Sequence, residues 1–157
     1  MQIKDRVFIV TGASSGIGLS TAVALSERGA KVALLARSTE ALQELAQKLP
    51  GSFPVTVDMT QFDRVREAIA AVHRQYGRVD GLVNNAGRSY ATSVEEIDPA
   101  VFDEIFHLNV LGPIVAMQDA GAGRRTVLQL WRWRQARIRG RSRSAGDRRR
   151  SGAVFRE

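Results

Sequence analysis

A run of small residues near the N-terminus has the composition of a phosphate-binding turn. Residues 11–18 read TGASSGIG and lie between an apolar run, at residues 7–10, and a stretch of helical character. In such a turn Gly12 permits the tight reversal, Gly16 lets a ligand approach the backbone, and Gly18 lets helix and strand pack closely. The helix N-terminus would then offer N–H groups and a positive dipole end to a pyrophosphate. A tight turn without a ligand is the alternative interpretation.

This turn belongs to a regular alternation of strand and helix signals. Four short apolar runs have the character of buried strands, at residues 7–10, 32–36, 53–57 and 79–83. Helical spacing or capping residues mark residues 17–28 and the stretches that begin at Ser38, at Thr60 with Asp63 in a capping-box pattern, and at Asp98 before Pro99. This alternation predicts an α/β fold with right-handed crossovers and a parallel sheet.

Polar residues follow at two later points of this pattern. Residues 84–87 read NNAG and come directly after the fourth apolar run, at the sheet edge where ligands of parallel sheets bind. These asparagines could line a ligand or tie neighbouring strand ends together. Asn109 precedes Pro113 by four residues, and proline has no N–H to donate to the Asn109 carbonyl. We therefore expect the helix to kink at Asn109.

Together, TGASSGIG, NNAG and Asn109 within LNVLG resemble the short-chain dehydrogenase/reductase family. The resemblance covers residues 1 to about 118, with the motifs in the right order and on the right elements. The glycines of residues 12–18 are spaced G-x3-G-x-G, whereas the standard dinucleotide-binding motif is G-x-G-x-x-G. It implies a doubly wound Rossmann-type sheet and the interconversion of alcohols and carbonyls with NAD(H) or NADP(H). The residues that would contact the cofactor are Gly12, Ser14, Ser15, Gly16, Ile17, Gly18, Asn85, Ala86 and Gly87.

The resemblance gives three further residues a role. Asn109 matches the catalytic asparagine, whose freed carbonyl would hold a water in a proton relay; the alternative is a polar side chain in a broken helix. The second strand ends at Arg37 with no carboxylate before Glu40, which favours NADP(H) over NAD(H), because a guanidinium can clamp a 2′-phosphate. Arg37 could instead pair with Glu40. Asp58 matches the adenine-contacting aspartate, or else it caps a turn.

The proton donor of the family has no counterpart in this sequence. Members use a serine and a Tyr-x-x-x-Lys pair, in which the lysine lowers the pKa of the tyrosine. The chain contains two tyrosines, both before Asn109, and no Tyr-x-x-x-Lys. Ser142, Ser144 and Ser151 lie among arginines, and we assign them no role. Catalysis is therefore expected to be missing, with an unknown small carbonyl or alcohol as substrate of the parent family.

Charge divides the chain into two parts. Residues 1–123 hold 11 basic and 14 acidic residues, whereas residues 124–157 hold 12 arginines, no lysine and 2 acidic residues. We place an NADP-binding Rossmann portion at residues 1–118 and a basic, low-complexity tail at 119–157. Three interpretations of the tail are open: a nucleic-acid-binding arm with its two tryptophans, a disordered extension, and an out-of-frame translation. We favour the last, since it also accounts for the missing catalytic residues.

Further expectations concern surroundings and partners. No cysteine is present, and no metal site is expected. No apolar run is long enough to span a bilayer, so we expect a cytoplasmic protein without membrane contact. About four strands of the usual seven are expected, with the fourth as an exposed edge. The helix after Pro99 would lack a later neighbour, so we expect the oligomer of the parent family to be impaired.

Overall fold

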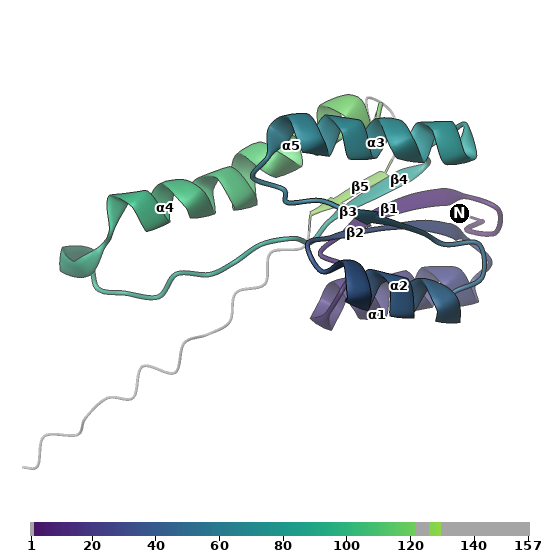
Figure 1. Cartoon of the computed structure of the whole chain (residues 1–157), viewed down its shortest axis with the longest axis horizontal. Helices are drawn as coiled ribbons and strands as arrows, with labels where there is room; N and C mark the ends of the chain where they lie inside the picture. Colours follow the sequence, from purple (N-terminus) through teal and green to yellow (C-terminus); the bar gives the residue numbers. More distant parts are fainter. Residues whose placement is uncertain (1, 122–125, 130–157) are drawn as a thin grey trace, which may run out of the picture.

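The computed structural model describes residues 2–121 and 126–129 of the chain, and its centre is a parallel β-sheet (Figure 1). The sheet has five strands in the order β3-β2-β1-β4-β5. Their bounds are β1 Val7–Thr11, β2 Lys31–Ala36, β3 Phe53–Thr56, β4 Gly81–Asn84 and β5 Thr126–Gln129. Strand order reverses at β1, which pairs in parallel with both β2 and β4. The predicted α/β fold of Rossmann type is confirmed.

Helices cover both faces of the sheet, as right-handed crossovers require. Helices α1 and α2 lie on one face, and α3 and α5 lie on the other (Figure 1). The helical elements are α1 Gly16–Glu27, α2 Thr39–Lys48, α3 Phe62–Tyr76, the 3-10 turn η1 Val94–Glu96, α4 Pro99–Phe106, the π turn η2 His107–Leu111, and α5 Gly112–Asp119. Each face of the sheet has its own apolar core, centred on Val10 and Leu34 beneath α1 and α2, and on Ile9 and Leu35 beneath α3 and α5.

The fifth strand contradicts the expectation that β4 is an exposed edge. β5 pairs with β4 in parallel, with Gly81 opposite Thr126 and Asn84 opposite Gln129. A four-residue run next to arginines carries little periodic signal, and pairing with a buried neighbour decides its conformation. Residues 122–125 and 130–157 of the tail lie outside the described residues. The structure therefore does not test the three interpretations of the tail.

One predicted cap is wrong and another is confirmed. Helix α3 begins after Gln61 and has no side-chain cap, because Asp58 takes the Thr60 hydroxyl and N–H instead of leaving Thr60 to cap the helix. Asp98 caps α4 by accepting a hydrogen bond from the Ala100 N–H, with Pro99 in the first turn.

The expected kink at Asn109 takes the form of the π turn η2. The Gly112 N–H donates to the carbonyl of His107, five residues back, and the next residue, Pro113, has no N–H to continue the backbone ladder. Gly112 itself is required by packing, because a Cβ there would collide with the Met59 carbonyl oxygen. The wider turn and the missing side chain together let α5 lie close to the β3–α3 loop.

The continuous helix Pro99–Asp119 contradicts the expectation that no segment of the chain is long and apolar enough to span a bilayer. It is 21 residues long with a mean hydropathy of 1.4, which is long and apolar enough to cross a membrane by length and composition alone. Helices of soluble proteins also satisfy that test. Only 22% of its apolar window is buried in the described structure.

Candidate functional site

The candidate site lies at the carboxyl edge of the sheet, where strand order reverses between β1 and β4. The glycine turn leaves β1 at this point, and residues 84–87 leave β4 beside it. Open parallel sheets bind ligands at this switch point, because the loops from the two strands diverge and leave a crevice. The sequence motifs predicted to form one site are therefore next to each other in space.

Backbone conformation explains why the turn needs glycine. Gly12 and Gly16 have φ of +67° and +57°, in the left-handed region where other residues are strained. Gly18 has a different constraint, since a Cβ at this position would collide with the Gly12 carbonyl oxygen and would lie 2.5 Å from Asn85 Nδ2. The first turn of α1 thus packs directly on the glycine turn, as predicted from spacing.

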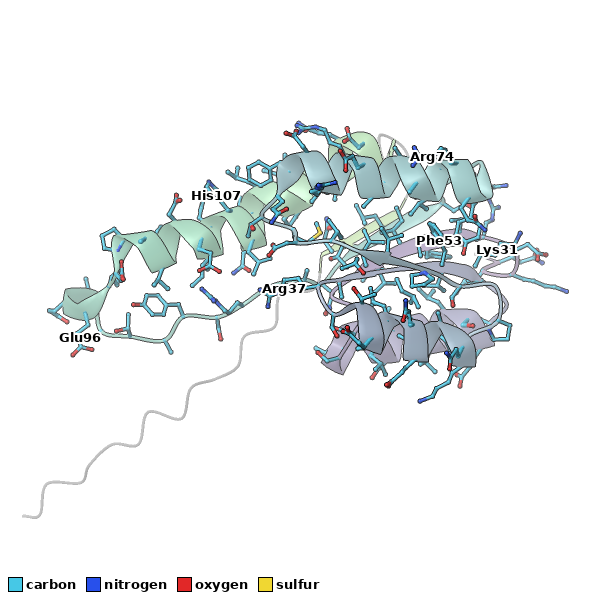
Figure 2. All side chains as sticks on the ribbon, in the orientation of Figure 1. Lys31, Arg37, Phe53, Arg74, Glu96 and His107 are labelled. Atoms are coloured by element: carbon cyan, nitrogen blue, oxygen red, sulfur yellow. The ribbon has the colours of Figure 1, made fainter. Side chains whose placement is uncertain are left out.

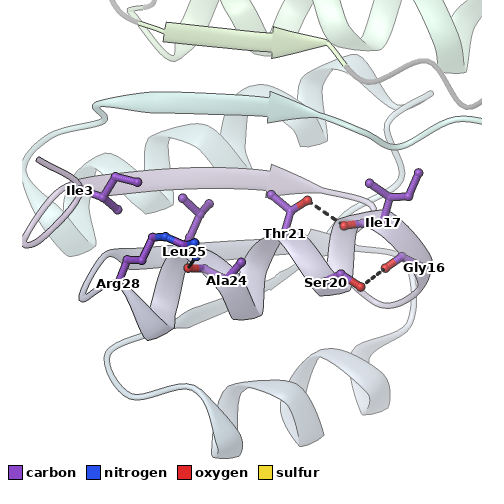
Figure 3. A pocket seen from close by; sticks show the side chains of 8 residues that line it. All are labelled: Ile3, Gly16, Ile17, Ser20, Thr21, Ala24, Leu25 and Arg28. Atoms are coloured by element: carbon purple, nitrogen blue, oxygen red, sulfur yellow. Dashed lines mark hydrogen bonds between the residues drawn. The ribbon is translucent and has the colours of Figure 1, made fainter. Parts of the chain in front are cut away.

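The N-terminus of α1 is open to an anion. Ser15 is the N-cap residue but makes no side-chain cap, and the first turn holds no acidic residue. The hydroxyls of Ser20 and Thr21 bond within the helix, to the carbonyls of Gly16 and Ile17 at 3.1 and 2.8 Å (Figure 3). The first N–H groups of the helix are therefore left to a ligand, where the dipole favours negative charge.

A buried threonine links the two loops of the site. Thr11 is 1% exposed, and its Oγ1 accepts hydrogen bonds from the N–H groups of Asn85 and Ala86, both at 3.0 Å. The same hydroxyl lies 3.4 Å from the Val83 carbonyl oxygen, to which it donates. Sequence reasoning missed Thr11, although a hydroxyl at the end of a buried strand is the signal that could have found it.

Asn85 ties the two strand ends together, which was one of the two open interpretations of NNAG. Its Nδ2 donates to the Thr11 and Gly12 carbonyl oxygens at 3.0 and 3.2 Å. Asn84 is 3% exposed, and its Nδ2 donates to the Pro113 carbonyl oxygen at 3.4 Å. The asparagines thus fix the shape of the crevice, whether or not they also line the cofactor.

Arg37 and Asp58 follow β2 and β3 at the same edge. Arg37 is exposed (Figure 2). Its side chain has no ion pair or hydrogen bond within the described part of the chain, so the alternative pairing with Glu40 does not form. Glu40 instead accepts from the Ser38 hydroxyl at 3.5 Å. Asp58 Oδ1 accepts from the Thr60 N–H and hydroxyl at 2.9 and 2.8 Å, so Asp58 does cap a turn.

Asn109 holds the backbone that leaves the NNAG segment. Its Oδ1 accepts from the Arg88 N–H at 3.0 Å, and its Nδ2 donates to the Arg88 carbonyl oxygen at 2.9 Å. A Cβ on Gly87 would lie 3.0 Å from Asn109 Oδ1, so the absence of a side chain at Gly87 leaves room for the Asn109 amide. Asn109 is therefore more than a polar residue in a broken helix: its side chain fixes the loop beside the π turn.

The hydroxyls of the two tyrosines are engaged in structural hydrogen bonds. Tyr76 ends α3 and donates to the Gly51 carbonyl oxygen at 2.7 Å, and burial raises the pKa of Tyr76 to about 12. The Tyr90 hydroxyl accepts from the Asp98 N–H at 3.3 Å in the loop before α4. A phenol with a raised pKa and a structural hydrogen bond is a poor proton donor near neutral pH.

An ion-pair cluster stabilises the opposite, amino-terminal edge of the sheet. Asp80 is buried and accepts from Arg78, from Arg6 at 3.0 Å and from the Val7 N–H at 3.0 Å. Burial opposes ionisation of the carboxyl, but these hydrogen bonds outweigh it and lower the pKa of Asp80 to about 2. Because the cluster lies away from the crevice, we assign it to stability.

Comparison with known proteins agrees with this geometry. The family model for short chain dehydrogenases matches residues 6–122, which is more than half of the chain. The chain belongs to the short-chain dehydrogenase/reductase family. It is 34% identical over 119 residues to an uncharacterized oxidoreductase of Staphylococcus epidermidis, and 34% identical over 120 residues to mouse dehydrogenase/reductase SDR family member 7B. These alignments cover 74% and 71% of this chain, and 51% and 37% of the relatives.

Solved structures of the family have the same architecture. A short-chain dehydrogenase from Streptomyces avermitilis superposes with a TM-score of 0.76 at 36% identity, over 82% of this chain and 50% of that protein. A 3-ketoacyl-(acyl-carrier-protein) reductase from Brucella melitensis, solved in complex with NADH, superposes with a TM-score of 0.75 at 28% identity, over 81% and 57%. The chain thus spans about half the length of the family members that it matches. Family membership implies a nicotinamide dinucleotide cofactor.

Proposed function

We propose that this chain binds NADP(H) in preference to NAD(H), and that it derives from an oxidoreductase of alcohols and carbonyls. When bound, the nicotinamide would supply hydride transfer to or from the carbon of such a substrate. The relative from Brucella melitensis binds NADH, so the choice between the two cofactors must come from residues of this chain.

The crevice residues fit a dinucleotide. Backbone N–H groups at the open N-terminus of α1 would bind the pyrophosphate, with Ser14, Ser15 and Ile17 beside them. Asp58 has its second carboxylate oxygen left to accept from an adenine amino group. Gly12 and Gly18 keep the turn free of side chains, since a Cβ on either would strike the Asn85 amide. Asn85, Ala86 and Gly87 would line the nicotinamide side of the crevice.

Arg37 is the observation that carries the preference for NADP(H). It is an exposed guanidinium at the carboxyl end of β2 with no intramolecular partner among the described residues, and its nearest acidic neighbour in sequence, Glu40, bonds to Ser38. An uncommitted guanidinium can form two charge-assisted hydrogen bonds with a phosphate, and it does not need to break an ion pair first. A carboxylate at this point would repel the same phosphate.

Matched charge reversals test the assignment. We expect Arg37→Glu to raise the Kd for NADPH about 10- to 100-fold and to leave the Kd for NADH within about threefold, because charge-assisted hydrogen bonds contribute about 1.5–3 kcal/mol. Arg74→Glu, at an exposed arginine in the last turn of α3, is the control and should change neither (Figure 2). Isothermal titration calorimetry on the wild-type chain and both variants gives the six dissociation constants. An unchanged ratio of the two constants in Arg37→Glu would exclude the phosphate clamp.

The chain is also proposed to bind without turnover. Asn109 is present, but the serine and the Tyr-x-x-x-Lys pair that the family uses for proton transfer are not in the sequence. We expect NADPH binding by calorimetry with no oxidation of NADPH at 340 nm in the presence of simple aldehydes and ketones. Steady turnover by material that is free of host reductases would contradict this part of the proposal.

A further inference from the structure

We propose that a groove along the outer side of α1 binds a single aliphatic chain that ends in a carboxylate, which is the chemistry of a fatty acid. The groove has a volume of about 570 Å³, within the range of small-molecule sites. Its lining includes Ile3, Ile17, Thr21, Ala24, Leu25 and Arg28 (Figure 3). Binding here needs neither the cofactor nor the missing proton donor, so the inference does not depend on the proposed function.

Helix α1 carries no charge along its outer side, in contrast to α2 and α3. Residues 16–26 contain no acidic or basic side chain, although Ile17 is 42% exposed. The exposed sides of α2 and α3 carry charged residues such as Glu44 and Arg66. Helices that face water ordinarily have polar and charged residues on that side. The outer side of α1 therefore favours contact with an apolar ligand.

The hydroxyls in the groove are already bonded within the helix. Ser20 and Thr21 each have one hydroxyl proton, and they donate it to the carbonyl oxygens of Gly16 and Ile17. Ile3 and Leu25 are partly buried and pack against the core between α1 and the sheet. The groove thus offers carbon atoms along its length and is supported by packed side chains, which suits an aliphatic chain.

Arg28 supplies a cation at one end of the groove. Among the described residues that line the groove, it alone is charged. Its Nη1 donates to the Ala24 carbonyl oxygen at 2.8 Å, and the guanidinium has no acidic partner in the described part of the chain. A guanidinium has five N–H donors, so further donors are left for a carboxylate.

The position of Arg28 gives the ligand a direction. Arg28 follows the last residue of α1, and Ile17 lies in the first turn, at the other end of the groove (Figure 3). The twelve residues of α1 span about 18 Å at 1.5 Å per residue. The carboxylate would bind at Arg28, and the chain would extend along the helix toward Ile17.

The distribution of charge favours this ligand over a second protein surface or a bilayer. Protein interfaces surround an apolar centre with a polar rim, whereas the charge of this groove lies at one end. Helices that lie on membranes carry lysine or arginine along their polar face, and α1 has none before its C-terminal end.

Calorimetric titration of the full chain tests the site. Laurate is the probe, and dodecan-1-ol is its uncharged counterpart, both below the concentrations at which they aggregate. Arg28→Gln should raise the Kd for laurate at least tenfold and leave the Kd for dodecan-1-ol within about threefold, because only the charge-assisted hydrogen bonds are lost. Arg74→Gln, at an exposed arginine of α3, is the control and should change neither constant. Absence of laurate binding, or an equal effect of Arg28→Gln on both probes, would overturn the proposal.

Filling the groove gives a second measurement. Ala24→Phe should weaken the binding of both probes at least tenfold, whereas Ala70→Phe, at an exposed position on α3, should not. Circular dichroism shows whether each variant is folded. Unchanged laurate binding by folded Ala24→Phe would overturn the proposal. So would a wild-type chain that binds vesicles, or associates with itself, through this groove and does not bind laurate.

A series of carboxylates tests the apolar part of the site without any substitution. From hexanoate to laurate, each added methylene should lower the Kd for the wild-type chain about fourfold, which corresponds to about 0.8 kcal/mol. A Kd that does not change with chain length would overturn the proposal, because binding would then rest on charge alone.

Discussion

The packing of α1 on the glycine turn makes Gly18→Ala the most informative single substitution in this chain. Gly18 lies in the first turn of a helix, and alanine in a helix is favoured over glycine by about 1 kcal/mol. Propensity alone therefore predicts a more stable protein. The structure predicts the reverse, because the new Cβ would collide with the Gly12 carbonyl oxygen and would lie 2.5 Å from Asn85 Nδ2.

The magnitude follows from which neighbours can move. The Gly12 carbonyl belongs to a turn with positive φ, and the Asn85 amide is held by its hydrogen bonds to the Thr11 and Gly12 carbonyl oxygens. Neither group can move away from a new Cβ without breaking contacts. Overpacking of this kind costs about 1–3 kcal/mol. After the gain of about 1 kcal/mol in helix propensity, we expect the free energy of unfolding to fall by up to about 2 kcal/mol. NADPH affinity should fall at least tenfold, because the helix N-terminus is displaced.

Urea denaturation followed by circular dichroism, together with calorimetric titration of NADPH, measures both effects. Gly51→Ala is the matched control: Gly51 has φ +72°, but a Cβ at this position would meet no atom within 4 Å, so backbone strain of about 1 kcal/mol is expected without any change in NADPH affinity. If Gly18→Ala were as stable as wild type and bound NADPH equally well, the close packing of α1 on the turn would be refuted.

Two further predictions concern stability. The lowered pKa of Asp80 stabilises the folded state by about 1–2 kcal/mol above the unfolded pKa of about 4, and this contribution is lost as pH falls toward 2. Asp80→Asn should therefore flatten the acid limb of the pH–stability curve measured by denaturant titrations. Asp63→Asn, at a side chain that is 95% exposed, should leave that limb unchanged. Thr11→Val should lower the free energy of unfolding by about 2 kcal/mol, because two N–H groups lose their acceptor. Thr39→Val, at an exposed threonine, should change the free energy of unfolding by less than about 0.5 kcal/mol in the same assay. Equal effects of the two substitutions would contradict the role of Thr11.

Local sequence signals were sufficient for the elements that carry their own apolar pattern. Four strands lie within two residues of the predicted runs, since a parallel strand buried on both faces needs an unbroken apolar stretch. The same logic failed for β5, whose four residues become a strand through pairing with β4. A capping box was expected at Thr60, but the Thr60 hydroxyl donates to Asp58, two residues earlier in the chain. A contact between distant segments decided the first of these differences, and a local turn decided the second.

At the site, sequence patterns located the residues but not their hydrogen bonds. The glycine spacing predicted close packing of helix and strand at Gly18, and in the structure the neighbouring atoms are the Gly12 carbonyl oxygen and Asn85 Nδ2. Proline chemistry predicted a break near Asn109 but not its form, which is a π turn followed by Gly112 packed closely on the Met59 carbonyl. Thr11 was missed because threonine is common in strands, and only burial shows that its hydroxyl must be bonded.

The crevice is therefore shaped mainly by main-chain groups. Side chains of Thr11, Asn85 and Asn109 bond to the backbone of facing loops, so they hold peptide groups in place without needing a ligand. A site of this kind can keep its form while the residues for proton transfer are absent, because none of them contributes to these bonds. Since backbone N–H groups recognise any pyrophosphate, the proposed preference for NADP(H) over NAD(H) rests on Arg37, whose guanidinium has no partner among the described residues.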